Sequence, residues 1–92
     1  MFIESLEIDD HILDKIESKH GVTFEEAEEA CLSDQRHVRH GREGLYKVFS
    51  RTIAVWYLLI VLVHMENSRW KIVTAREMTD SERKLYKQVC EG

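Results

Sequence analysis

The segment from Arg36 to Arg42 contains the side chains that most often contact nucleic acids. Arg36, Arg39 and Arg42 are interspersed with His37 and His40. Arginine forks match phosphate oxygens, and exposed imidazoles can stack on bases. A divalent cation held by the two histidines would lie among three positive charges, which disfavours a metal site. The composition therefore fits a contact with an RNA backbone, and it fits a solvated loop equally well.

The common signatures of cofactor-dependent enzymes are missing from the sequence. It contains no phosphate-binding glycine loop and no GxSxG, HExxH or CxxC motif. Cys31 and Cys90 are far apart in the chain, which favours reduced thiols over a disulfide framework or a zinc site. We therefore expect no cofactor and no bound metal.

Length and composition indicate one globular domain over residues 1–92. Hydrophobic residues make up 43% of the chain, charged residues 33%, and proline is absent. Residues 1–34 hold eleven acidic and two basic side chains, whereas residues 35–92 hold six acidic and eleven basic. A basic surface can attract a polyanion despite the net charge of −4. The alternative is that these charges only solvate an acidic helical face and a basic sheet face.

The sequence also argues against a membrane span and against secretion. The longest apolar run, residues 53–63, has eleven residues, whereas a membrane-spanning helix needs about 20. The N-terminal residues are acidic where a signal peptide would be basic and then apolar. We expect a cytoplasmic protein that does not bind a membrane.

The first third of the chain predicts two helices. Residues 10–19 have apolar side chains at helical spacing, and Gly21 then offers the left-handed conformation that ends a helix. Thr23 and Glu26 have the spacing of a capping box, which predicts a second helix ending near Ser33.

The middle of the chain predicts an antiparallel meander. Residues 35–44 are polar and predict a loop or an irregular edge strand. Residues 45–52, 53–64 and 70–75 are rich in β-branched and aromatic side chains and predict three strands, with a turn at residues 66–68.

The last predicted element is a helix that begins at a second capping box, Thr79 with Glu82. The order of elements predicts an α+β fold, in which residues 53–63 form the centre of an antiparallel sheet. We expect the two N-terminal helices and the C-terminal helix to pack on one face of that sheet.

Two segments resemble the signature segments of the BrnT family of toxins. They are residues 19–27, KHGVTFEEA, and residues 72–86, IVTAREMTDSERKLY. Gly41-Arg42-Glu43-Gly44 also resembles one branch of the family, and the similarity extends over residues 9–87. The resemblance implies a RelE-like fold, cleavage of RNA without a metal ion, and a type II toxin–antitoxin system in which a small DNA-binding antitoxin neutralises the toxin.

The sequence departs from the family pattern at two places. Val55-Trp56 stands where many relatives carry Gly-Arg, and Ile8 replaces an aromatic residue. The departure leaves room for an alternative, a non-catalytic RNA- or protein-binding module with the same fold. A third reading is a small structural or dimerisation domain.

The chemistry of such a toxin can be matched to residue types. RNA supplies its own nucleophile, the 2′-hydroxyl, so the protein needs a base, cations on the phosphate and an acid for the leaving 5′-oxygen. The catalytic candidates are Arg76, His20, Glu77 and Tyr86. The candidates for RNA binding are Arg39, His40, Arg42, Lys47, Arg51 and Arg83.

Arg76 is the leading candidate, because it ends an apolar strand within the second family segment. The alternative role for Arg76 is an ion pair with Glu77, Glu82 or a carboxylate of the first helix. Arg83 and Tyr86 share one helical face, where they can complete a phosphate site or pack the helix on the sheet.

His20 has two readings as well. A protonated imidazole beside Gly21 can serve as the acid, or it can only cap the C-terminal end of the first helix.

The resemblance also implies partners. We expect an RNA substrate and a cognate protein antitoxin that is acidic where it covers the basic surface. Contact with operator DNA is expected only through the antitoxin. The acidic residues 1–34 face away from that contact or contribute to a homodimer.

Overall fold

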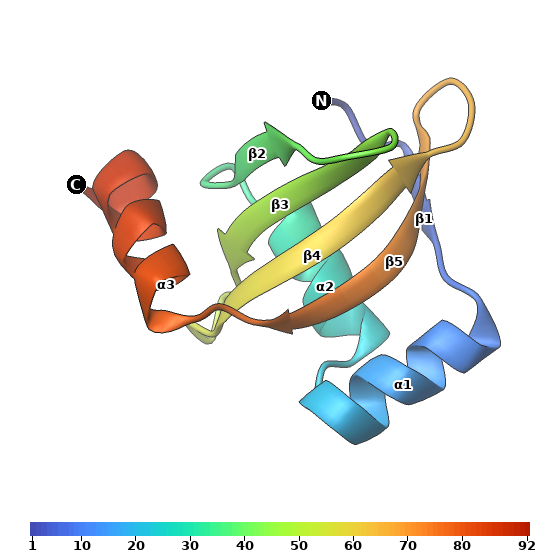
Figure 1. Ribbon diagram of the computed structural model, residues 1–92, viewed down its shortest axis with the longest axis horizontal. Coiled ribbons are helices and arrows are strands. Elements are labelled where there is room, and N and C mark those ends of the chain that lie inside the picture. The colour runs from blue at the N-terminus through green and yellow to red at the C-terminus, as the bar shows by residue number, and fades with distance from the viewer.

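The apolar segment in the middle of the chain forms the central strand of the sheet. In the computed structural model, which describes residues 1–92, β4 (Tyr57–His64) lies between β3 (Leu45–Arg51) and β5 (Arg69–Glu77), antiparallel to both (Figure 1). β2 (His37–His40) pairs with β3 at one edge. The order of the sheet is β1-β5-β4-β3-β2. The central place predicted for this segment is confirmed.

The fifth strand, β1 (Ser5–Glu7), was not predicted and makes the sheet mixed. It runs parallel to β5 and pairs with residues 69–71. Three residues are too few to produce a recognisable alternation of apolar and polar side chains. At the opposite edge, β2 confirms the edge-strand alternative for the segment after residue 35.

The strand predicted over residues 53–64 begins only at Tyr57. The residues before it form a closed turn, in which the Val55 amide donates to the Thr52 carbonyl (2.9 Å) and the Trp56 amide donates to the Thr52 hydroxyl (3.1 Å). Ile53 in this turn is 85% exposed. The apolar residues of this turn therefore do not belong to a strand.

The helix signals near the N-terminus are confirmed. α1 (Asp10–His20) ends at Gly21, which has a φ of 68° in the left-handed region. α2 (Phe24–Cys31) begins with the predicted capping box, because the Thr23 hydroxyl accepts from the Glu26 amide and the Glu26 carboxylate accepts from the Thr23 amide. Both ends are thus set by local hydrogen bonds.

The C-terminal helix has the same kind of start. α3 (Asp80–Tyr86) follows Thr79, whose hydroxyl accepts from the amide of Glu82 while the Glu82 carboxylate accepts from the Thr79 amide. A short π-helical turn, Lys87–Glu91, continues it.

α1 and α2 cover one face of the sheet. α1 packs against β5, and α2 packs against β3 and β4. β4 contributes Leu58, Ile60 and Leu62 to this larger core. The helices contribute four buried side chains to this core, and only the first of them is large: Ile16, Ala27, Ala30 and Cys31. Small side chains on α2 let its backbone approach the sheet closely.

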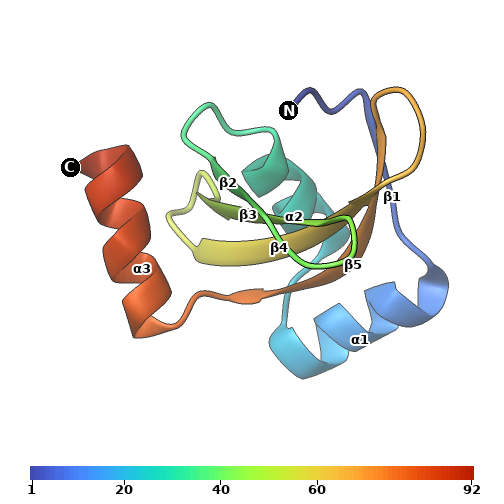
Figure 2. The same ribbon diagram turned by 45° about the horizontal axis from the view of Figure 1, so that its top comes forward.

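The prediction that all three helices pack on one face is wrong. α3 packs on the opposite face, where Tyr86 joins Phe49, Leu59 and Met78 in a second, smaller core, and both ribbon views show α3 apart from α1 and α2 (Figures 1 and 2). Successive side chains of a strand point to opposite faces. A strand that is apolar at every position therefore needs a cover on both.

Polar contacts also hold α3 in place. Arg76 donates to both carboxylate oxygens of Glu82, at 2.8 and 3.0 Å. The buried Tyr86 hydroxyl donates to the Gln35 carbonyl at 2.5 Å. The Arg76 guanidinium is the main cause that lowers the pKa of the Glu82 carboxyl, and the Thr79 amide adds to it.

No helix of the protein combines the length and the apolar character that crossing a bilayer requires.

Two isoleucines, the buried Ile60 and the exposed Ile53, test this architecture. Ile60→Ala should lower the free energy of unfolding by about 2–5 kcal/mol, because it empties part of the larger core. Ile53→Ala is the matched control and should change it by less than about 0.5 kcal/mol, because Ile53 is 85% exposed. Urea unfolding followed by circular dichroism measures both. Equal losses in the two variants would contradict the register of β4.

The Arg76–Glu82 pair predicts a pH dependence of stability. Since the pKa of Glu82 is lowered in the folded protein, its contribution is fully present above the unfolded pKa of about 4.3 and is lost as the pH falls through the folded value. Glu82→Gln should therefore cost about 1 kcal/mol at pH 7. That difference should shrink in acid below about pH 4.

Urea titrations of wild type and variant at a series of pH values measure this difference. Glu77→Gln is the control, because the Glu77 carboxylate makes no ion pair. A Glu82→Gln cost that stays constant down to pH 2 would show that the charge of Glu82 does not stabilise α3.

Candidate functional site

The sheet face opposite α1 and α2 is only partly covered. It is turned toward the viewer in Figure 1, with α3 beyond one end of the strands. Strand pairing places Arg39, Lys47, Val61 and Thr74 side by side in one row across β2, β3, β4 and β5. Arg39 and Lys47 are exposed, and the other two are half-buried. We call this row of four residues the open face.

Two positive charges meet on the open face without a counter-ion. Arg39 lies directly opposite Lys47 in the β2–β3 pair, and neither makes an ion pair. Like charges at directly opposed positions destabilise a sheet. An anion bound between them would remove that repulsion, so this is the point of the sheet best suited to a phosphate.

The neighbouring row of paired residues on the same side of the sheet is partly covered by α3. Strand pairing aligns His37, Phe49, Leu59 and Arg76, of which Phe49 and Leu59 belong to the smaller core. His37 is half-buried, and its ring lies 6.1 Å from that of Phe49. An imidazole one row away from two cations can exchange a proton with a bound substrate. The sequence placed His37 in the basic segment 36–42 but not among the catalytic candidates. The alternation of His37 and Arg39 on one side of a strand was the signal for it.

Arg76 lies on this side of the sheet but already has partners. Its guanidinium donates to both oxygens of Glu82 and to the Glu77 carbonyl (3.0 Å). The Glu82 carboxylate raises the pKa of Arg76 further. The ion pair weighed as the alternative role of Arg76 is therefore present, and its side chain remains 35% exposed.

Tyr86 is a core residue. Its side chain is fully buried, it packs edge-on against Tyr57 with ring centroids 5.8 Å apart, and its hydroxyl donates to the Gln35 carbonyl. Burial raises the pKa of Tyr86 to about 12. In this arrangement the phenol joins α3 to the segment before β2 instead of facing a substrate.

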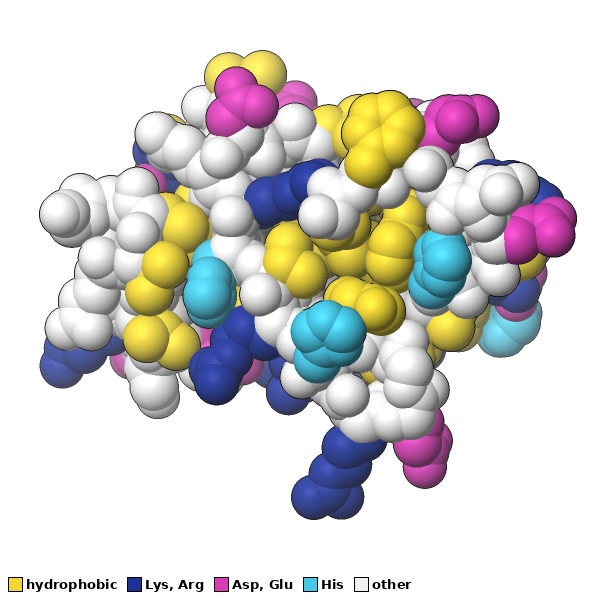
Figure 3. Space-filling view, turned by 90° about the horizontal axis from the view of Figure 1, so that it is seen from above, with side chains coloured by type: hydrophobic (Ala, Val, Ile, Leu, Met, Phe, Trp, Pro, Cys, Tyr) yellow, Lys and Arg dark blue, Asp and Glu magenta, His cyan; other side chains and the backbone are white.

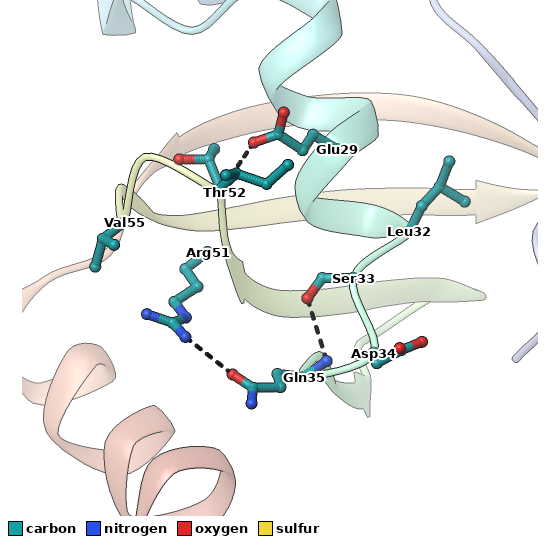
Figure 4. A pocket seen from close by; sticks show the side chains of 9 residues that line it. Glu29, Leu32, Ser33, Asp34, Gln35, Arg51, Thr52 and Val55 are labelled. Atoms are coloured by element: carbon teal, nitrogen blue, oxygen red, sulfur yellow. Dashed lines mark hydrogen bonds between the residues drawn. The ribbon is translucent and has the colours of Figure 1, made fainter.

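Arg51 lies at the end of β3, away from the open face. It pairs with Glu91 (3.1 Å) and donates to the Gln35 side chain (3.2 Å). With Leu32, Ile53 and other residues it lines a cavity of about 630 Å³ between the end of α2 and the turn that leads to β4 (Figure 4). Its charge is thus already neutralised by the C-terminal residues.

The remaining candidates are spread over the surface. Arg83 pairs with Asp80 on α3 (2.6 Å). His20 ends α1, where a basic residue complements the helix dipole, on the covered side of the sheet. Glu77 is exposed and pairs with Leu58, whose side chain belongs to the larger core. None of these three adjoins Arg39.

His40 belongs to a chain of rings on the other face of the sheet. His40 contacts Tyr46 (4.4 Å between centroids), Tyr46 contacts Trp70 (5.0 Å), and Trp70 contacts His64 (4.6 Å). Figure 3 shows histidine side chains around a hydrophobic area on the surface seen from above. Arg42 is exposed in the turn between β2 and β3. The basic segment after residue 35 thus divides between two faces.

The side chains offer no group of three or more histidine, cysteine, aspartate or glutamate residues that could hold a metal ion. The thiol of Cys31 is buried, which raises its pKa to about 12, and it makes no disulfide. The cations and the imidazole of the described site can bind a phosphate and exchange a proton.

Comparison with known proteins identifies the fold. No protein-family model and no curated protein sequence matches the chain. Among solved structures, the crystal structure of the ribonuclease toxin BrnT from Brucella abortus superposes with a TM-score of 0.68 and covers 82% of this chain and 96% of that one, at 10% sequence identity. The expected BrnT-like fold is thereby confirmed, and the protein has the fold of a BrnT toxin.

Proposed function

We propose that the protein is an endoribonuclease toxin of a type II toxin–antitoxin system and binds RNA on its open face. The observation that carries the proposal is the Arg39–Lys47 pair, two opposed cations without a carboxylate partner on a sheet with the BrnT fold. The name of the similar structure, a ribonuclease toxin, supports the same class of activity. Cleavage takes place in the cytoplasm.

The proposed reaction uses the 2′-hydroxyl of RNA as the nucleophile. Arg39 and Lys47 bind the scissile phosphate and stabilise the charge that develops on its oxygens. His37, one row away, takes the proton of the 2′-hydroxyl, and a water molecule gives a proton to the leaving 5′-oxygen. The bond between phosphorus and the 5′-oxygen breaks, and the products are a 2′,3′-cyclic phosphate and a free 5′-hydroxyl. The step needs no metal ion and no cofactor.

Arg76 has a secondary place in this scheme. Because both of its terminal nitrogens donate to Glu82, it reaches an RNA phosphate only by sharing or exchanging those hydrogen bonds. Arg42 lies in the turn after β2, where it can contact a flanking nucleotide, whereas His40 lies on the other face of β2 and contacts only RNA that continues around this edge strand. Arg51, Arg83, His20, Glu77 and Tyr86 act through the fold in this proposal.

The Val55-Trp56 departure bears on the alternative function. Val55 and Trp56 lie in the turn before β4, and Trp56 packs against the larger core instead of facing the open face. The departure thus leaves the Arg39–Lys47 pair untouched. A non-catalytic binding module remains the second candidate, and it would bind RNA through the same pair without cleaving it.

The antitoxin is part of the proposal. It neutralises the toxin by covering the open face with an acidic segment, and operator DNA is contacted only through it. A homodimer through the acidic N-terminal third is a further expectation.

Replacement of the opposed cations tests the proposal most directly. Arg39→Gln and Lys47→Gln should each lower RNA cleavage at least about tenfold, because each removes a charge-assisted contact of about 1.5–3 kcal/mol. Thermal stability should stay equal or rise, since the repulsion is gone. Lys84→Gln, an exposed lysine of α3, is the control. The assay uses purified protein and a labelled RNA in excess EDTA, and mass spectrometry of the product ends.

The outcomes of this assay separate the candidates. Cleavage in EDTA with cyclic phosphate ends supports the enzyme. Binding without cleavage by the wild type would favour the non-catalytic module. Wild-type levels of cleavage in both open-face variants would refute the assignment of the site.

A comparison of Arg76→Ala with Glu82→Gln decides the role of Arg76. Both changes break the same ion pair, so both should cost a similar amount of stability, about 1 kcal/mol. If Arg76 contacts RNA, Arg76→Ala should slow cleavage several-fold more than Glu82→Gln. Equal rates in the two variants would assign Arg76 to the docking of α3 alone.

A further inference from the structure

Exposed apolar side chains gather around the cavity at the end of β3. Leu32 is 53% exposed, Ile53 85% and Val55 50%, and all three line the cavity of about 630 Å³. Leu32 comes from the end of α2, whereas Val55 comes from the turn before β4, and the two lie on opposite sides of it (Figure 4). Single exposed apolar residues are common, but such a group around a hollow indicates a contact surface.

A second hollow continues the first. A cavity of about 380 Å³ shares Leu32, Ser33 and Asp34 with the first cavity and adds Phe2, which is 71% exposed. Four of the nine large exposed hydrophobic residues of the chain therefore line two adjoining cavities. We call these two cavities together the end groove.

The backbone at the rim of the end groove is strained. Val55 has a φ of 65°, a left-handed conformation that is strongly unfavourable for a β-branched residue. A glycine would relieve the strain and would lose only the buried half of the Val55 side chain, which is 50% exposed. The fold thus gains little from valine here, and its exposed half is available for contact with a partner.

The charge of the end groove selects the kind of partner. Glu29 and Asp34 line it and make no ion pair with a lysine or arginine. The first cavity contains one arginine, Arg51, which is neutralised by Glu91, and the second contains Arg36, which donates to the carbonyls of Met1 and Cys31. The first cavity thus combines exposed apolar side chains with the carboxylates of Glu29 and Asp34, of which Glu29 also accepts from the Ile53 amide (2.6 Å). Such a lining complements apolar side chains flanked by lysine or arginine.

We propose that the end groove is the anchoring site for a basic, amphipathic segment of the antitoxin. The identity of this partner rests on the proposed function. Apolar side chains of the segment contact Leu32, Ile53 and Val55, and a lysine or arginine pairs with Asp34. A stable complex buries at least about 1,000 Å², so the groove is one part of a larger interface.

The end groove and the open face can be occupied by one partner chain. Arg51 borders the groove and lies four residues from Lys47 on β3, a separation of roughly 13 Å along a strand. A basic segment anchored in the groove thus delivers the acidic segment that follows or precedes it to the open face.

The test is binding of the purified full chain to the protein encoded by the neighbouring open reading frame, measured by calorimetry and by co-purification. Leu32→Ser with Ile53→Ser should weaken binding at least tenfold. Asp34→Asn should weaken it less and reduce its dependence on salt. Val89→Ser is the control, because Val89 is equally exposed, at 53%, but belongs to the C-terminal turn outside both cavities.

Val55→Gly separates partner contact from a structural role. It should raise the urea midpoint of the isolated protein and at the same time weaken binding several-fold. A valine needed for the fold would give the opposite change in stability. The proposal is overturned if Val55→Gly and the double variant bind like wild type, or if the wild type does not bind the neighbouring protein.

Failure of the docking site and failure of the toxin assignment give different results. RNA cleavage should be unchanged in all groove variants, because none of these residues lies on the open face. If the wild type binds the neighbouring protein through the groove but does not cleave RNA, the docking site is supported and the assignment as an enzyme is refuted. If the wild type is a dimer and the double variant is a monomer, the groove binds a second copy of this chain. That result would overturn the antitoxin as the occupant of the groove.

Discussion

The structure depends on the burial of β4 from both sides. A strand with leucine, isoleucine and valine at successive positions presents apolar area to each face of the sheet, and water must be excluded from both. α1 and α2 exclude it from one face, and α3 excludes it from part of the other. The uncovered remainder of the second face is what makes a site possible. The position of α3 thus divides that face into a core and an uncovered surface.

The cations at the two ends of that face differ in whether a carboxylate neutralises them. Near α3, the cations Arg76 and Arg51 are neutralised by Glu82 and Glu91, and this stabilises the attached helix. Further along the strands, Arg39 and Lys47 remain unneutralised. The protein therefore keeps its stabilising ion pairs under the helix and leaves its electrostatic potential where a ligand can reach it.

The sequence predicted the local features of the fold well and its long-range arrangement less well. The caps at Gly21, Thr23 and Thr79 depend on neighbouring residues, so short motifs predict them. The face that receives α3 depends on which side of β4 is left open by the other helices, and the pairing of β1 depends on residues more than sixty positions away. The sequence also indicated Arg39 and Lys47 as candidates for RNA binding; the structure places them opposite each other and exposed, and their binding of RNA stays a prediction. The sequence assigned Arg76 and Tyr86 both a catalytic and a structural role and could not decide between them, because the partners of these side chains depend on tertiary packing.

The parallel pairing of β1 with β5 has a consequence for the timing of folding. Ser5–Glu7 can join the sheet only after residues 69–71 have left the ribosome, and Arg69 then closes the pair through Glu7. Contacts between segments so distant in sequence form late and slow the folding of small domains. The nascent chain therefore cannot complete its sheet before β5 has been made, and the finished surface first exists only after that point.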